Sequence, residues 1–142
     1  MSGIVVGIDS SSHSMTALEW AMREAAVHRA PLTVVTVETV VASGWGGSQV
    51  YPEDFQLRDK AQKAAEEAVA SIAQKLGDAA PESVTVRALI GQPAEQMLEA
   101  AKDADHLILG RRGSGGFNRL TLGSVSSQVA HHAACPVTIV PD

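Results

Sequence analysis

Residues 4–37 read IVVGIDSSSHSMTALEWAMREAAVHRAPLTVVTV, and this stretch decides the fold. It opens on a short apolar run, which is typical of a strand that is buried on both faces. A polar turn over residues 9–14 follows, and the apolar residues after it recur at helical spacing, which predicts a helix over about 15–30. After Pro31, the β-branched residues 32–37 predict a second strand.

The same alternation continues to the end of the chain. Three further strands are predicted at residues 84–90, 106–109 and 136–140, and three further helices at about 53–76, from Pro93 onward, and at about 124–134. Thr16 and Glu19 have capping-box spacing near the start of the first helix, and Gly77 suits the C-terminal cap of the long helix. Residues 42–53 interrupt the alternation of strands and helices, because their glycines and Pro52 disfavour a regular element.

Strands that alternate with helices form a parallel sheet with helices on both faces. The sequence contains no repeat, low-complexity tract or linker, so we interpret residues 1–142 as one α/β domain. Its 45% hydrophobic and 19% charged residues exclude a wholly disordered chain. No apolar run approaches the ~20 residues of a membrane helix.

Charge and cysteine content narrow the class of function. Sixteen acidic residues against eleven Lys and Arg give a formal charge of −5, which argues against nucleic-acid binding. One cysteine, Cys135, excludes an internal disulfide framework and fits a reducing compartment. The N-terminus has no basic region before its apolar stretch, so we expect a cytoplasmic protein that is not secreted. One cysteine and five scattered histidines also lack zinc-finger spacing.

The segment after the fourth strand is the best candidate for a binding site, because ligands of open α/β sheets bind beyond the carboxyl ends of the strands. Five glycines lie among the fourteen residues from Gly110 to Gly123, so backbone N–H groups can turn toward a ligand. Residues 123–126 then open a helix whose start favours phosphate. Arg111, Arg112 and Arg119 add positive charge. The alternative interpretation is a flexible glycine loop with solvated arginines.

The common phosphate loops are absent, since there is neither G-x-x-x-x-G-K-[ST] nor a G-x-G-x-x-G after the first strand. Instead, Gly110-x-x-Gly113, nine residues, and Gly123-Ser124 resemble the G-2x-G-9x-G-[ST] motif of ATP-binding universal stress proteins. The opening Val6-Gly7-Ile8-Asp9-Ser10-Ser11 is similar to that family's V-G-x-D-x-S start. Gly91-x-Pro93-Ala94 and the ending His132 to Val137 also resemble family segments, so the resemblance covers the whole chain.

The resemblance implies a fold and a ligand. The fold is a doubly wound, Rossmann-like sheet of five parallel strands in the order 3-2-1-4-5, numbered along the chain. The ligand is ATP, or AMP or ADP, with Mg²⁺ held through the phosphates and not by a protein metal site. The implied contacts are Ile8, Asp9 and Ser10 against the nucleoside, backbone around Val37 at adenine, Gly110, Arg112 and Gly113 at ribose and phosphates, and Gly123, Ser124, Val125 and Ser126 at the phosphates.

Asp9 has a second interpretation, as a structural cap of the first helix, and both duties can coexist. The function implied is that of a stress-response sensor or regulator that binds ATP. Two alternatives stay open: a slow ATPase or nucleotide hydrolase of the same α/β superfamily, and an interaction protein that uses no nucleotide. No catalytic residue is predicted, because no paired carboxylates or positioned base stand beside the glycines. The resemblance also implies a homodimer that pairs through residues 137–140, with neither nucleic acid nor membrane as a partner.

Overall fold

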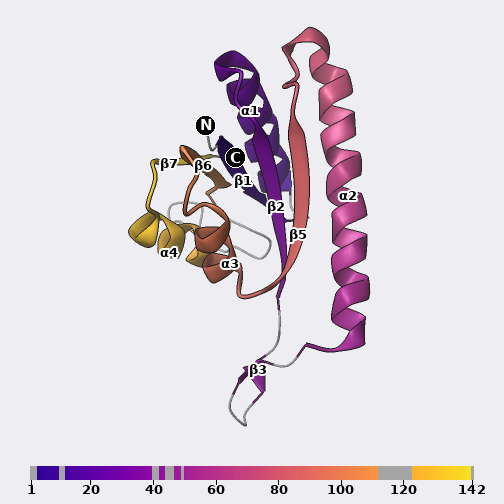
Figure 1. The fold of residues 1–142 in the computed structure, drawn as a ribbon, viewed down its shortest axis with the longest axis vertical. Coiled ribbons are helices and arrows are strands. Elements are labelled where there is room, and N and C mark those ends of the chain that lie inside the picture. The colour runs from indigo at the N-terminus through magenta and orange to yellow at the C-terminus, as the bar shows by residue number, and fades with distance from the viewer. Residues whose placement is uncertain are drawn as a thin grey trace.

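The computed structural model describes residues 3–9, 12–39, 42–43, 47–48, 50–111 and 123–141, drawn as a ribbon in Figure 1. The elements are β1 (Ile4–Ile8), α1 (Ser12–His28), β2 (Leu32–Thr39), β3 (Ala42–Ser43), β4 (Gly47–Ser48), α2 (Pro52–Leu76), a 3₁₀ turn (Gly77–Ala79), β5 (Val84–Gly91), α3 (Pro93–Ala100), β6 (His106–Gly110), α4 (Ser124–His132) and β7 (Val137–Val140).

Five of the strands form one sheet in the order β5-β2-β1-β6-β7, and every neighbouring pair is parallel. Counted along these five strands, the order is 3-2-1-4-5, so the predicted doubly wound, Rossmann-like sheet is confirmed. β1 is buried along its whole length, as its continuous apolar run predicted. The chain winds outward in one direction from β1 to β5 and in the other from β6 to β7, and the reversal lies between β1 and β6.

Helices cover both faces of the sheet. The side chains of Ile4, Val6 and Ile8 pack with the apolar stripes of α1 and α2, whereas Val5 packs with α3 and α4 on the opposite face. Alternate residues of a buried strand point to opposite faces, which explains this division. Leu18 and Met22 of α1 are fully buried, and each such side chain contributes about 1.5–3 kcal/mol to folding.

Two local expectations were wrong, and a third was confirmed. Helix α1 begins at Ser12, several residues before the expected start, so Thr16 and Glu19 lie inside it and form no capping box. Residues 42–43 and 47–48 pair as a short antiparallel hairpin, although the glycines there argued against any regular element. Gly77 does cap α2, with φ 56° and its N–H donating to the Ala73 carbonyl; this positive φ is one that glycine adopts without strain.

Gly7 allows α3 to lie directly on β1. A Cβ at this position would stand 2.7 Å from both Leu109 Cδ2 and Met97 Cε, closer than carbon atoms approach each other. Met97 is buried and belongs to the apolar cluster that joins α3 to the sheet. The glycine of the opening Val6-Gly7-Ile8-Asp9 segment therefore serves the packing of α3 against β1.

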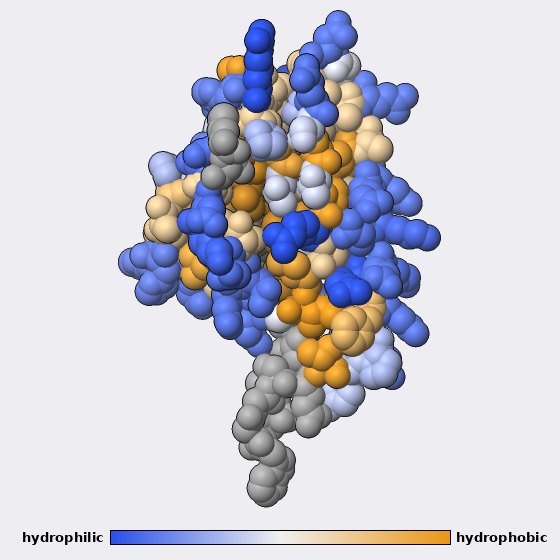
Figure 2. Space-filling model, in the orientation of Figure 1, coloured by the Kyte–Doolittle hydropathy of each residue, from blue (hydrophilic) through white to orange (hydrophobic). Residues whose placement is uncertain are grey.

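The outer edge of β5 is partly closed by a side chain of α2. The carboxamide of Gln62 donates from Nε2 to the Val86 carbonyl over 2.9 Å and accepts the Ala88 N–H at Oε1 over 2.8 Å. Figure 2 shows apolar surface running along the middle of this face, where Figure 1 places β5, with hydrophilic side chains on either side. The amide of Gln62 thus covers two backbone groups of an edge with which no described strand pairs.

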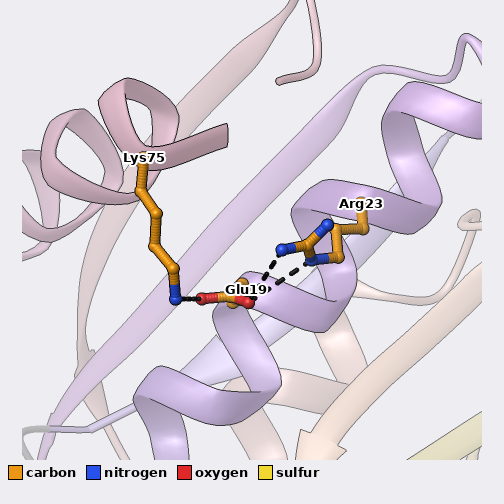
Figure 3. Close-up of polar contacts among 3 residues, drawn as sticks. All are labelled: Glu19, Arg23 and Lys75. Atoms are coloured by element: carbon orange, nitrogen blue, oxygen red, sulfur yellow. Dashed lines mark hydrogen bonds and ion pairs between the residues drawn. The ribbon is translucent and has the colours of Figure 1, made fainter. Parts of the chain in front are cut away.

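Glu19 joins α1 to the last turn of α2 (Figure 3). Its carboxylate accepts from Lys75 Nζ over 2.6 Å and from Arg23 Nη2 over 3.2 Å. The hydrogen bond from Lys75 holds the pKa of Glu19 below its ordinary value, and Arg23 adds to the effect. All three side chains are partly exposed, so this bridge is a modest contribution to stability.

Candidate functional site

The site predicted from sequence lies at the carboxyl ends of β1 and β6, where the strand order reverses. α1 follows β1 on one face of the sheet, and α4 follows the β6 end on the other face. Ligands of doubly wound sheets bind at such a switch point, because the two connections diverge there and leave the strand ends uncovered. The described parts of the predicted site are the end of β1, the end of β2, the end of β6 and the start of α4.

Asp9 follows β1 and is fixed by Ser14 in the first part of α1. The Asp9 N–H donates to Ser14 Oγ over 2.8 Å, and the Ser14 hydroxyl donates to Asp9 Oδ1 over 2.7 Å. Ser14 is buried, and a buried hydroxyl group needs a hydrogen-bond partner. The two bonds with Asp9 supply that partner. Asp9 therefore ties the end of β1 to α1 through the Ser14 side chain, and its predicted roles as a helix cap and as a nucleotide contact stay predictions.

Val37 lies where β2 continues past the end of β1. The last pair between these strands is Ile8 with Thr36, whereas the pairing of β2 with β5 continues to Thr39. The N–H and C=O of successive residues point to alternate sides of a parallel strand. Leu32 donates its N–H toward β5, and the Pro31 carbonyl accepts from Ile4 of β1, so odd-numbered residues of β2 turn their backbone toward β1. Val37 consequently turns its backbone groups to the β1 side at the point where β1 ends.

Two hydrogen bonds join the end of β6 to the start of α4, and a third joins it to β7. The Ser126 hydroxyl donates to the Gly110 carbonyl over 2.7 Å. The Gly123 N–H donates to the Arg111 carbonyl over 2.8 Å, and the Arg111 N–H donates to the Val140 carbonyl of β7 over 3.0 Å. The two glycines that frame the predicted loop are thereby fixed next to each other in space.

The first turn of α4 presents backbone donors. The first helical hydrogen bond of α4 runs from the Ser127 N–H to the Gly123 carbonyl, so the N–H groups of Ser124, Val125 and Ser126 have no acceptor within the helix. Gly123, the N-cap residue, has no side chain that could accept them. Three donors without an acceptor inside the helix, at the positive end of its dipole, favour an anion.

Arg111, whose carbonyl accepts from the Gly123 N–H, has an unsatisfied side-chain donor. Its Nε is buried and has no hydrogen-bond partner among the residues that the structure describes. A buried donor of this kind is costly unless a partner arrives, and the loss is larger for a charged group. A phosphate or carboxylate oxygen is the acceptor that a guanidinium best accommodates. The residues present therefore fit an anionic ligand.

The remaining predicted residues divide into two groups. The side chain of Ile8 is buried in the core on the α1 side of the sheet, where it packs against other apolar side chains. Ser126 is also buried, and its hydroxyl is used on Gly110, which leaves its N–H as the group open to a ligand. Ser10, Arg112 and Gly113 lie outside the described residues. The structure thus brings together the ends of β1, β2 and β6 and the start of α4, and the binding of a ligand by these residues stays a prediction.

Sequence reasoning missed the role of Ser14 and placed Arg111 outside the predicted contacts. Ser14 carries only one local signal, its position five residues after Asp9 at a helix start, where hydroxyl and carboxylate side chains commonly pair. Arg111 was noted for its charge, but only the fold reveals that its Nε is buried. Among the described residues no group of three or more His, Cys, Asp or Glu side chains stands close enough to hold a metal ion.

The histidines and the cysteine outside this site have simple structural roles. His131 and His132 are exposed in the last turn of α4, where a cation is favoured by the negative end of the dipole. Cys135 packs partly buried against the cluster beneath α3 and α4, and burial raises the pKa of its thiol. In the parts of the chain that the structure describes, no helix is long and apolar enough to cross a membrane.

A parallel five-stranded sheet with this order and helices on both faces defines a doubly wound α/β protein. The profile of the universal stress protein family matches residues 1–141, and the chain belongs to that family. A universal stress protein of Mycolicibacterium smegmatis is 34% identical over 139 residues, which cover 97% of this chain and 47% of the relative. The chain spans about half the length of the curated relatives it matches.

Solved structures agree with this assignment. The universal stress protein UspA from Lactobacillus plantarum superposes with a TM-score of 0.76 at 25% identity, covering 98% of this chain and 97% of that one. Two further structures share the fold at 24% identity: a universal stress protein in complex with cAMP, with a TM-score of 0.66, and one from Archaeoglobus fulgidus in complex with dAMP, with a TM-score of 0.67. They cover 97% and 98% of this chain, and 94% and 97% of their own.

Proposed function

We propose that this protein is a nucleotide-binding stress-response sensor or regulator that holds ATP, AMP or ADP at the switch point between β1 and β6. The observation that carries the proposal is the junction of β6 with α4. There, the first turn of α4 is fixed beside Gly110 with N–H groups that have no acceptor within the helix, and Arg111, the residue after Gly110, has a buried Nε with no partner among the described residues. These donors suit phosphate oxygens, and the complexes of related proteins with cAMP and dAMP support an adenine nucleotide.

The proposed residues have distinct duties. Ser124, Val125 and Ser126 would donate backbone N–H groups to the phosphates, with Gly110, Gly123, Arg112 and Gly113 forming the remainder of the phosphate cradle. Val37 would offer backbone groups to adenine, and Ile8, Asp9 and Ser10 would border the nucleoside. Mg²⁺, bound through the phosphates, would neutralise part of their charge. No described residue is needed as its ligand.

We propose further that two copies pair through β7. This strand forms one edge of the sheet. The Pro136 carbonyl accepts from Leu107 of β6 and the Val140 carbonyl from Arg111, the residue after β6. The even-numbered residues of β7 therefore face inward, and Ile139 turns its backbone groups to the open edge. An uncovered edge is a template for pairing with another chain. A homodimer would join the two sheets through these groups, in the reducing cytoplasm that the single cysteine favours.

The deciding experiment identifies the nucleotide that co-purifies with the protein and measures ATP binding by calorimetry, with and without Mg²⁺. We expect a dissociation constant on the micromolar scale or weaker, with Mg²⁺ strengthening it. Arg111→Met should weaken ATP binding at least about tenfold, because a hydrogen bond to a charged group is worth about 1.5–3 kcal/mol. Arg87→Met, which removes an exposed cation from β5 at the far edge of the sheet, is the matched control. Undiminished binding by folded Arg111→Met would refute the assignment.

A further inference from the structure

The hydrogen bonds of Gln62 have the form of a strand pairing. In a parallel ladder, one residue of the neighbouring strand bonds to the carbonyl of residue i−1 and the N–H of residue i+1. Gln62 bonds to the carbonyl of Val86 and the N–H of Ala88, which flank Arg87. Its carboxamide, chemically equivalent to a peptide group, therefore occupies the place of one peptide of a sixth strand.

The other outward backbone groups of β5 are available for pairing with a β-strand. The even-numbered residues of β5 turn their backbone groups outward, and no strand among the described residues pairs with that side. Gln62 uses only two of these groups, so the Val86 N–H and the Ala88 carbonyl are left, together with the outward groups of Val84 and Ile90. An exposed row of such groups binds extended peptides in many proteins.

A hollow of about 280 Å³ lies beside this edge, on the face that carries α3. Arg87 and Leu89 of β5 line one side, and Gln96, Glu99, Ala100, Lys102 and Asp103 line the other. Alternate side chains of a strand added to β5 would point into this hollow, because they share the face of Arg87 and Leu89. The hollow is therefore placed to hold side chains of such a strand.

The charges of the hollow select what enters it. Lys102 is bonded to Glu99 over 2.8 Å, and its pKa is raised by this pair and further by the nearby Asp103. Arg87 is exposed and makes no ion pair or hydrogen bond with any side chain that the structure describes. Arg87 and Asp103 are thus the two charged side chains of the hollow without an ion pair among the described residues. Arg87 lies on β5 itself, so its guanidinium is the charge that stands directly opposite a residue of an added strand, where a carboxylate is favoured.

We propose that the outer edge of β5, together with the hollow between β5 and α3, docks an extended segment of a partner protein that presents a carboxylate opposite Arg87. Gln62 competes with this segment for hydrogen bonds to the Val86 carbonyl and the Ala88 N–H, and so limits its access to the edge. Pairing with a second copy of β5 is disfavoured, because an antiparallel register centred on Arg87 sets two guanidinium groups opposite each other. The site lies on the far side of β2 from the proposed nucleotide site and is independent of it.

The probe is a labelled peptide, VTVEALIG, which is the β5 sequence with glutamate in the place of Arg87. Its affinity is measured by fluorescence anisotropy against that of the unaltered VTVRALIG. We expect VTVEALIG to bind roughly fivefold tighter, since opposite charges across strands attract and like charges repel. Arg87→Glu should reverse the preference, and Gln62→Ala should strengthen binding severalfold by removing the competitor. Protection of the Val86 N–H from exchange on binding locates the peptide at the edge.

Three outcomes overturn the proposal. Equal affinity of the two peptides would point to a second copy of the chain as the occupant. Competition by N-acetylglutamate at the same concentration as VTVEALIG would indicate a small carboxylate as the ligand. Retained preference for VTVEALIG in Arg87→Glu, a surface change that leaves the core untouched, would mean that Arg87 does not select the partner.

Discussion

Ser126 and Gly110 are joined by a hydrogen bond from a helix side chain to the last carbonyl of a strand, over 2.7 Å. The bond sets where α4 begins relative to the end of β6. The donors of the first turn of α4 therefore keep a fixed position beside the strand ends. This relationship links the stability of the fold to the geometry of the proposed phosphate site.

Removing this hydroxyl should affect both properties. Ser126→Ala leaves the Gly110 carbonyl without its partner, so we expect a loss of about 1 kcal/mol in the free energy of unfolding, measured in urea. ATP affinity should fall in the folded variant, because the start of α4 is no longer held against β6. Ser124→Ala is the control, since Ser124 is exposed at the same helix start. Equal effects of the two substitutions would contradict the special role of Ser126.

Gly7→Ala tests the contact between β1 and α3. The new methyl group meets Met97 and Leu109 within 2.7 Å, so we expect a destabilisation of about 1–3 kcal/mol from overpacking. Met97→Leu alone should cost under about 1.5 kcal/mol. Together the two changes should cost less than the sum of their separate effects, because a shorter side chain makes room for the methyl group. Strict additivity in this double-mutant cycle would contradict the contact.

The bridge at Glu19 should make stability depend on pH. Because the pKa of Glu19 is lower in the folded than in the unfolded chain, its contribution is present above the ordinary pKa of 4.5 and is lost as pH falls through the lowered value. Glu19→Gln should therefore destabilise the protein by about 0.2–1 kcal/mol at neutral pH and make no difference in strong acid. Urea unfolding of both proteins at several pH values measures this. A difference that persists unchanged in acid would exclude the bridge as its cause.

Dimerisation through β7 can be tested at one backbone group. Ile139→Pro removes the outward N–H of Ile139 and should weaken self-association measured by light scattering. Ile139→Ala is the control, because it trims the side chain but retains the N–H. If wild-type protein is monomeric at high concentration, the proposed pairing is wrong.

Turnover of ATP should be negligible or very slow, far below the roughly 1–100 s⁻¹ of committed phosphoryl-transfer enzymes. Beside the phosphates the proposed site offers backbone amides, serines and arginines, and none of these orients or deprotonates a water molecule. Asp9 is the carboxylate of the site, and it is hydrogen-bonded to the Ser14 hydroxyl. His13 lies at the start of α1, and a neutral imidazole can act as a base near pH 7. Phosphate release is therefore measured for wild type and His13→Ala. Fast release that disappears in the variant would identify an enzyme.

Most of the fold could be predicted because its signals are local. Apolar runs, proline and glycine punctuation and helical periodicity located all five strands of the sheet within about two residues. The start of α1 was missed because a run of serines and a histidine gives no apolar stripe, although serines are good helix starters. The short hairpin at residues 42–48 was missed because two-residue strands carry no periodicity.

The candidate site was predictable only in part. Glycine spacing and the family resemblance located Gly110, Gly123 and the start of α4, since glycine positions reflect the needs of the backbone. Contacts between distant segments, such as the Arg111 carbonyl with Gly123 or Gln62 with Ala88, depend on how helices pack on the sheet. No local pattern encodes them.

The extension of β2 beyond the end of β1 has a consequence for how this protein changes over evolutionary time. At Val37 the groups facing that side are a peptide N–H and C=O, which nearly every amino acid supplies alike. Mutational drift at this position therefore leaves the hydrogen-bonding pattern of the exposed edge unchanged. Only a proline, or an insertion or deletion that changes how many residues β2 extends beyond the end of β1, can change the hydrogen-bonding groups at this edge.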